Sequence, residues 1–297
     1  MSTPVSIRSA AVDVFFNLRG IQTTRYARLA SNAIIFYDQL ITFDLEVNSI
    51  WKSRWTFAKV LFLVNRYYGL ASAIFNTYAF FAPKFSEKAS AICVEFYLWE
   101  GWTGLVGCML ADIILQMRIY ALYTKNKRVT SLMMGFFVIC FALSAWIMGS
   151  SLKGLTAAST QIIGGQFCVS PLIPPHFYIF WIPMLSFELL LCSLAVIRAY
   201  ESYHASGNPV FNGHRLFSIL IRDSLVYFFA IGVTYLTCLV VWILEPNILL
   251  EAPIGFSLAI SCTLGSRMIL NLREPSREQE GPSKVFIELD DVRRGGV

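Results

Sequence analysis

Apolar stretches of about twenty residues recur along nearly the whole of this chain. Each is long enough to cross a hydrocarbon layer about 30 Å thick as a helix. Hydrophobic residues make up 56% of the 297 positions and charged residues 14%, whereas ordinary soluble domains hold about 45–50% and 25%. The sequence therefore excludes a soluble cytosolic enzyme and predicts a multi-pass membrane protein that contacts the lipid bilayer along most of its length.

The apolar stretches are continuous and lack the alternation that is typical of a membrane β-strand. Because lipid offers no hydrogen-bond partners to the backbone, spanning segments are helices or closed barrels. The pattern predicts an all-α membrane protein, a bundle of seven transmembrane helices within 24–272. The expected spans are 24–43, 57–80, 92–118, 129–150, 176–199, 224–244 and 252–272.

Lysine and arginine residues are concentrated in the loops after spans one, three and five, which the positive-inside rule assigns to the cytoplasm. This places the N-terminal segment 1–23 outside and the polar, disordered tail 273–297 in the cytoplasm, and we expect the plasma membrane. The four arginines up to residue 28 argue the other way, but the later loops decide the prediction. The net charge of +5 comes from separate loops, so nucleic acid is not an expected partner.

The region of the first two spans has a distinctive sequence. It reads YDQLITFDLEV at 37–47 and KVLFLVNRY at 59–67. Two less distinctive segments follow later in the chain, RIYALY at 118–123 and SRMILNLR at 266–273. These segments resemble a family of uncharacterised seven-span proteins of mushroom-forming fungi, catalogued as domain of unknown function six-five-three-three. The resemblance implies an integral membrane protein without an assigned activity, likened to receptors by its topology, and it names no ligand.

Two opposite charges lie at similar depths in spans one and two. An ionisable group inside the bilayer costs about 2.5–3.5 kcal/mol, so it needs a partner or a cavity. Asp38 and Arg66 lie about 8 and 13 Å from the cytoplasmic face at the helical rise per residue. The sequence therefore predicts a buried ion pair between them, with Asn65 or Tyr37 as a supporting partner. We expect this pair to hold the fold, with a ligand role as the alternative.

Carboxyl groups in spans three and five predict a polar pocket in the outer half of the bundle. Glu100 and Glu188 lie about 12 and 18 Å below the outer surface, so both should point inward. Together with Trp99 and Trp102 they form the candidate pocket for a small cationic or hydroxylated ligand. The alternatives are that the tryptophans anchor the helix in lipid and that the carboxyls are protonated and hydrogen-bonded to neighbouring spans.

The inner ends of spans three and seven form a candidate coupling face, consisting of Arg118, Tyr120 and Arg267. Arg118 and Tyr120 stand where G-protein-coupled receptors carry an Asp-Arg-Tyr triplet, but the acid is missing and one residue separates the two. Arg118 as a plain topology signal is therefore the alternative. Arg267 is also placed to pair with Asp112 or Asp38.

Cys93 and Cys168 are the two of seven cysteines that lie outside the interior of the expected spans. Cys93 stands at the outer start of span three and Cys168 in the long outer loop after span four. An oxidising compartment permits a disulfide between them, which would hold the loop across the bundle. A free Cys168 is the alternative.

The residues that known membrane enzymes need are absent. No lysine stands in 252–272 for a retinal Schiff base, and the three histidines lie near interfaces or in loops. No phosphate-binding loop, zinc-protease motif or serine nucleophile motif occurs. The sequence therefore predicts no enzyme activity, no cofactor and no metal.

The topology and the candidate pocket favour a receptor-like protein, in which a small ligand binds outside and the inner loops contact a cytosolic transducer. The alternative is a transporter or lipid-handling protein that uses the buried charges as a path. A structural protein, whose charges only join helices, is a third hypothesis. A sealed inner face favours the receptor, whereas a continuous polar path from Glu100 to Arg267 favours the transporter.

Overall fold

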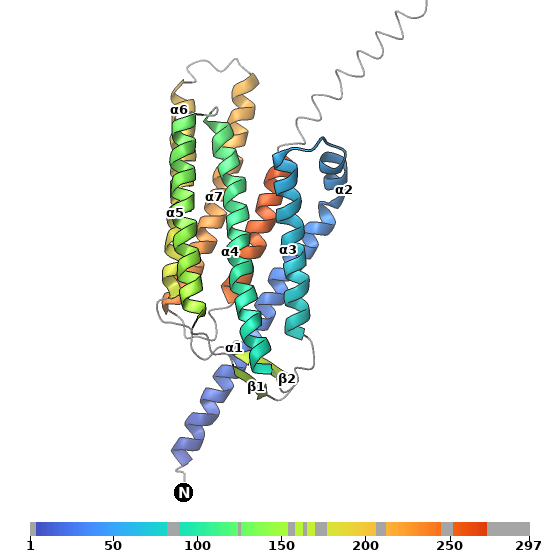
Figure 1. Cartoon of the computed structure of the whole chain (residues 1–297), viewed down its shortest axis with the longest axis vertical. Coiled ribbons are helices and arrows are strands. Elements are labelled where there is room, and N and C mark those ends of the chain that lie inside the picture. The colour runs from blue at the N-terminus through green and yellow to red at the C-terminus, as the bar shows by residue number, and fades with distance from the viewer. Residues whose placement is uncertain are drawn as a thin grey trace, which may run out of the picture.

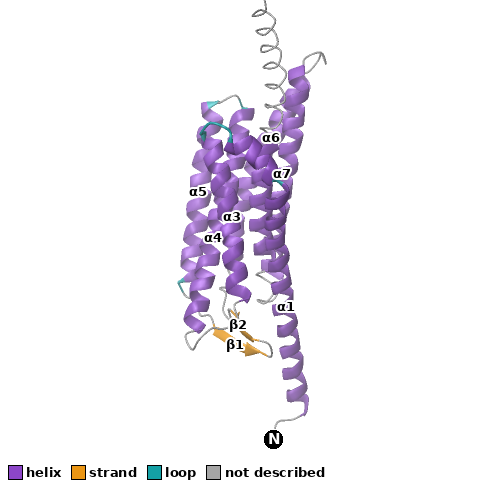
Figure 2. Ribbon diagram, turned by 90° about the vertical axis from the view of Figure 1, so that its right-hand side faces the viewer, coloured by secondary structure: helices purple, strands orange, loops and turns teal. Residues whose placement is uncertain are grey.

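Long helices lie side by side in the computed structural model, and α1 extends past its neighbours at the N-terminal end (Figure 1, Figure 2). The structure describes residues 4–81, 89–123, 126–153, 158–162, 165–169, 177–205, 212–244 and 252–271. The long helices are α1 (Pro4–Ile41), α3 (Phe57–Phe81), α4 (Ala89–Leu122), α5 (Lys127–Leu152), α6 (Trp181–Ala205), α7 (Asn212–Leu244) and a last one, Ala252–Asn271, called here the 252–271 helix. Three short elements complete the helical part: α2 (Phe43–Glu46), the π-helical η1 (Val47–Trp51) and the 3₁₀ turn η2 (Phe177–Phe180).

Five helical segments among the described residues are long and apolar enough to cross a membrane. They are Val94–Leu122, Lys127–Leu152, Phe177–Glu201, Leu225–Leu244 and Ala252–Asn271. The chain is therefore a helical, multi-pass membrane protein. Helices α1 and α3 are also long enough to cross a membrane. Both carry buried charged and amide side chains, which lower their mean hydropathy.

Each of the seven expected spans coincides with a long helix, although α1 begins at Pro4 instead of near residue 24. Hydropathy marks where a helix can enter lipid, whereas the helix itself continues until a residue breaks it. Pro4 suits a first helical position, because its fixed φ is helical and the N–H it lacks is unpaired there. Segment 1–23 is thus helical from residue 4 onward, and the expected tail 273–297 lies outside the described residues.

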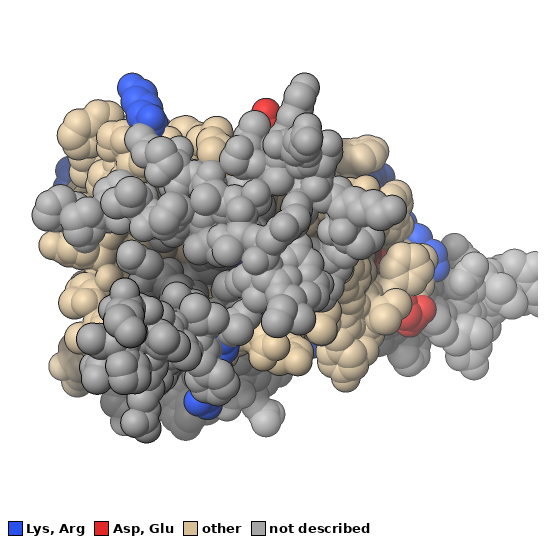
Figure 3. All heavy atoms as spheres, turned by 90° about the horizontal axis from the view of Figure 1, so that it is seen from below, with Lys and Arg blue, Asp and Glu red and all other residues tan. Residues whose placement is uncertain are grey.

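A β-hairpin, which the all-α prediction missed, lies between α5 and α6. Strands β1 (Ala158–Ile162) and β2 (Gly165–Val169) pair antiparallel, with Ser159 opposite Cys168. The hairpin contacts α4 and lies at the end of the bundle from which α1 protrudes (Figure 1). Seen from this end, the described side chains include few charged ones (Figure 3). The glycines next to β-branched and aromatic residues were the local hairpin signal.

The apolar core has two parts. The larger part joins α4, α5, α6 and α7, whereas a smaller cluster of Ile35, Ala73 and Ala259 lies between α1, α3 and the 252–271 helix. Small residues bring the 252–271 helix close to its neighbours, as they do in other membrane bundles. A Cβ at Gly69 of α3 would collide with the side chain of Cys262. The contact of α1 and α3 with the 252–271 helix is called here the seam, and the polar groups described next lie along it.

Candidate functional site

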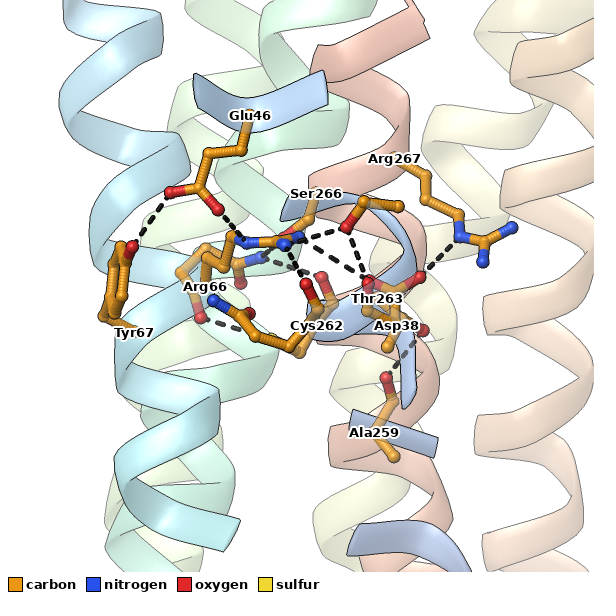
Figure 4. A network of polar contacts seen from close by, with 12 residues as sticks. Asp38, Glu46, Arg66, Tyr67, Ala259, Cys262, Thr263, Ser266 and Arg267 are labelled. Atoms are coloured by element: carbon orange, nitrogen blue, oxygen red, sulfur yellow. Dashed lines mark hydrogen bonds and ion pairs between the residues drawn. The ribbon is translucent and has the colours of Figure 1, made fainter. Parts of the chain in front are cut away.

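Arg66 is the centre of a charged network between α1, α2 and α3 (Figure 4). Its side chain is 2% exposed, and its Nε lies 2.7 Å from Oε2 of Glu46. Its Nη1 lies 3.7 Å from Oδ2 of Asp38. Its Nη2 donates to Oγ1 of Thr42 at 2.7 Å and to the Gln39 carbonyl oxygen at 3.1 Å. The structure thus brings Asp38 and Arg66 together, but with Glu46 as the nearer carboxylate.

Arg267 completes the network from the 252–271 helix. Its Nε donates to Oδ1 of Asp38 at 2.5 Å, while 44% of its side chain remains exposed (Figure 4). Of the two partners that the sequence allowed, Arg267 therefore contacts Asp38. Two arginines and two carboxylates make the network formally neutral, which suits a site where an unpaired charge would be costly.

Glu46, which the sequence interpretation missed, is completely buried at the end of α2. Its Oε1 accepts hydrogen bonds from Trp51 Nε1 at 3.0 Å and from the Tyr67 hydroxyl at 2.9 Å. Position 46 lies beyond the expected first span, which ends at residue 43. Its spacing from Asp38, about two helical turns, was the available signal, since such residues share one helix face.

The expected supporting partners of the ion pair have other roles. Asn65 donates to the Cys262 carbonyl oxygen at 3.0 Å and to Ser266 Oγ at 3.1 Å, so it joins α3 to the 252–271 helix. Tyr37 is 65% exposed, so it is not a buried partner of the pair. Depth along a helix was predictable, whereas the direction of each side chain around the helix depends on which neighbours pack against it.

A second ion pair joins α1 to α4. Arg28 and Glu100 form a two-pronged contact, with Nη1 2.5 Å from Oε1 and Nη2 donating to Oε2 at 2.7 Å. Their side chains are only 6% and 11% exposed, and the guanidinium lies over the Phe96 ring. Arg28 bears only on the orientation in the sequence analysis, so this partner of Glu100 was not predicted.

A small cavity, called here the Arg28–Glu100 pocket, adjoins this pair between α1, α3, α4 and the 252–271 helix. Its volume is about 20 Å³, which is room for about one water molecule. The Asn76 side chain lines it, and its buried Oδ1 has no hydrogen-bond partner in the described part of the chain. The polar residues that line the pocket are Arg28, Ser31, Asn32, Asn76, Glu100 and Thr103.

Of the four residues predicted to form a ligand pocket, Glu100 alone lines this cavity. Trp99 and Trp102 are each 43% exposed, and Trp99 packs against Phe75 with ring centroids 5.0 Å apart. Glu188 is 2% exposed on α6, inside the other part of the bundle. The structure does not bring the four together, because neighbouring positions of a helix point about 100° apart.

Two of the three predicted coupling residues, Arg118 and Tyr120, lie at the opposite end of α4. Arg118 is buried, and its Nη2 donates to the Met268 carbonyl oxygen at 2.8 Å. Tyr120 is 39% exposed. Two of the three predicted coupling residues, Arg118 and Arg267, therefore bind within the bundle, and Tyr120 remains for contact with a partner.

The same end of α4 is held against α6. The Tyr123 hydroxyl donates to the Leu194 carbonyl oxygen at 2.8 Å, and Arg198 Nε donates to the Leu122 carbonyl oxygen at 3.2 Å. Burial raises the pKa of Tyr123, and the nearby Glu201 adds to the increase. The tyrosine therefore stays protonated at neutral pH and keeps donating to α6.

The disulfide prediction concerns side chains outside the described ones. Strand β2, which contains Cys168, contacts α4, in which Cys93 lies. The cysteines whose side chains are described, at positions 108, 140, 192, 238 and 262, are free. The bridge between Cys93 and Cys168 stays a prediction.

Residues 26–71 match the sequence model of a family of unknown function (DUF6533). The matched segment runs from the middle of α1 through α2 and η1 into α3. It contains Arg28, Asp38, Glu46 and Arg66, whereas the partners Glu100 and Arg267 lie outside it. No curated protein matches the chain significantly.

Proposed function

We propose that this protein is a receptor-like, seven-helix membrane protein that senses a small ligand at the Arg28–Glu100 pocket. One observation carries the proposal. Helix α1 supplies Arg28 to the pocket and Asp38 to the charged network, and the 252–271 helix lines the pocket with Gly255 and supplies Arg267 to the network. Because helices move as stiff units, a ligand that separates Arg28 from Glu100 also shifts the network.

The ligand competes with Arg28 for Glu100, so the charge of Glu100 indicates the chemical class of the ligand. A cationic group replaces Arg28 at Glu100, and the unpartnered oxygen of Asn76 accepts a hydrogen bond from it. The cavity of about 20 Å³ must widen to admit it, so the ligand selects a more open state of the bundle. A cytosolic transducer then meets the inner end, where Tyr120 is exposed.

The closed inner end supports a receptor over a carrier. Arg118 ties α4 to the 252–271 helix, and Tyr123 ties α4 to α6. Between the pocket and the network, the cluster of Ile35, Ala73 and Ala259 separates the polar groups of the seam.

A ligand of the pocket should raise the melting temperature of the purified full chain, and Glu100→Gln should remove the effect. At one hundred times its dissociation constant a ligand adds about 2.7 kcal/mol to the free energy of unfolding. A library of small amines, screened by thermal shift, measures this. Glu95→Gln, an exposed change on the same helix, is the matched control. Equal stabilisation of Glu100→Gln would contradict the location of the site.

A transporter is the second candidate, because buried polar side chains continue along the same helices on both sides of the apolar cluster. They are Ser31, Asn32, Ser72, Ser261 and Ser266. A compound that stabilises the protein is tested for uptake into proteoliposomes. Uptake above that of protein-free vesicles establishes a carrier, whereas binding without uptake supports the receptor.

The proposal includes seven spans with the N-terminus outside and the C-terminus in the cytoplasm, in the plasma membrane. The basic loops of the sequence support this orientation, since Lys52, Arg54 and Arg128 fall at the end of the bundle proposed to face the cytoplasm. We expect an N-terminal epitope tag to be accessible to antibody on intact cells and a C-terminal tag only after permeabilisation. Accessibility of both tags on intact cells would mean an even number of spans.

A further inference from the structure

Two buried carboxyl groups lie apart from both ion-pair sites, in the larger apolar core. Asp112 on α4 is 3% exposed and Glu188 on α6 is 2% exposed. Helix α4 packs against α6, and the buried neighbours Leu115 and Phe187 belong to one apolar cluster, so the two groups lie in one region of the core. Neither takes part in an ion pair within the described part of the chain. Two carboxyl groups in an apolar interior therefore lack a protein cation.

Three of the four oxygens of these groups lack a hydrogen-bond partner in the described part of the chain. Oδ1 of Asp112 and both carboxyl oxygens of Glu188 are buried without a partner among the described residues. Buried polar atoms normally have a protein or water partner. A merely protonated carboxylic acid would donate its proton to a neighbouring acceptor, and Glu188 has none there. An ion or a water molecule could supply the partner that these oxygens lack.

Two neutral side chains nearby have unpartnered atoms as well. Gln116 lies one turn after Asp112 on α4, and its buried Nε2 has no partner among the described residues. Ser144 on α5 is completely buried, and its Oγ likewise has none, although helical serines usually bond the preceding turn. Ser144 follows Cys140 by one turn, and the Cys140 thiol lies 3.7 Å from Ser186 Oγ on α6, while α5 also packs against α4. Helices α4, α5 and α6 thus each contribute buried polar atoms that have no hydrogen-bond partner among the described residues.

We propose that Asp112 and Glu188 form the binding site of a sodium ion in the core of the bundle. Carboxylate and hydroxyl oxygens are the ligands that hard cations prefer. The described residues contain no group of three or more His, Cys, Asp or Glu side chains that would hold a transition metal. One sodium ion and one proton neutralise the two carboxyl groups, and water completes the coordination.

Protons compete with sodium at this site. Among the side chains that the structure describes, the other titratable groups near the two carboxyls are Cys108, Cys140, Cys192 and Tyr235, from α4, α5, α6 and α7. None of them carries a positive charge, so none replaces the ion. The affinity for sodium should fall as the pH is lowered, because a second proton then takes the place of the ion.

Binding of radioactive ²²Na⁺ to the purified full chain, measured by scintillation proximity, tests the site. We expect retention that unlabelled NaCl displaces and choline chloride does not. Asp112→Asn and Glu188→Gln should weaken the binding about tenfold or more, as loss of a metal-site group does. Glu95→Gln, the same change at an exposed position of α4, should bind as the parent does.

Folding is monitored separately, by circular dichroism and gel filtration of each variant. If the carboxyl variants do not fold, the test uses the parent protein alone. Its melting temperature is then compared between NaCl and choline chloride at equal ionic strength. A higher melting temperature in NaCl supports the site. Absence of retained ²²Na⁺ in the parent, equal binding by folded carboxyl variants, or a melting temperature that depends on pH but not on sodium would overturn it.

Discussion

Replacing Arg66 by methionine should lower the free energy of unfolding by about 3–5 kcal/mol, the cost of removing one partner of a buried ion pair. The reason is Glu46, which is completely buried and would keep only the neutral donors Trp51 and Tyr67. Asp38 contributes less to the loss of stability, because Arg267 still donates a hydrogen bond to it. Thermal and denaturant unfolding of the purified protein measures the loss.

The matching double variant should recover most of that loss. Glu46→Gln combined with Arg66→Met removes both charges, and well-packed neutral replacements of a buried pair are often close to neutral in stability. The double variant Asp38→Ala with Arg66→Leu should recover less, because it leaves Glu46 without a cation. If the effects of Glu46→Gln and Arg66→Met simply add, the two side chains are not coupled.

Glu100→Ala should have an effect of similar size, about 3–5 kcal/mol, because it leaves the buried Arg28 without its carboxylate. The exposed pair Arg198–Glu201 is the matched control, since its carboxylate side chain is 53% exposed. Glu201→Ala should change stability by at most about 1 kcal/mol, as is typical of surface ion pairs.

Combining Glu100→Leu with Arg28→Leu distinguishes a structural pair from a functional one. If the pair only holds helices, the double variant should regain the parent's melting temperature and respond to ligands unchanged. If the pair forms the ligand site, the double variant folds but no longer responds to any compound that stabilises the parent. A loss on Glu201→Ala as large as that on Glu100→Ala would show that burial does not set these costs.

The positions of the long helices were predictable because hydropathy depends only on local sequence. The contact between Asp38 and Arg66 was predictable for a related reason, since adjacent antiparallel spans bring residues of equal depth together. Arg267 was a candidate partner of Asp38 on depth alone, and the structure selects that pairing.

Lateral arrangement was not predictable in the same way. Glu100 pairs with Arg28 because α1 lies beside α4 at that depth, and no property of a single helix states which helices are neighbours. Glu46 was missed because α2 and η1 continue the helical path beyond the apolar stretch. The first error concerns which helices are neighbours, and the second concerns where the helical path ends; tertiary packing determines both.

The 252–271 helix is synthesised after the other described helices, yet it lies beside the first. Until it emerges from the ribosome, Asp38 of α1 lacks Arg267, and Asn65 of α3 lacks Cys262 and Ser266. Helices α1 and α3 are therefore made before these partners of Asp38 and Asn65 exist. Insertion of the 252–271 helix is then the step that supplies these partners to α1 and α3.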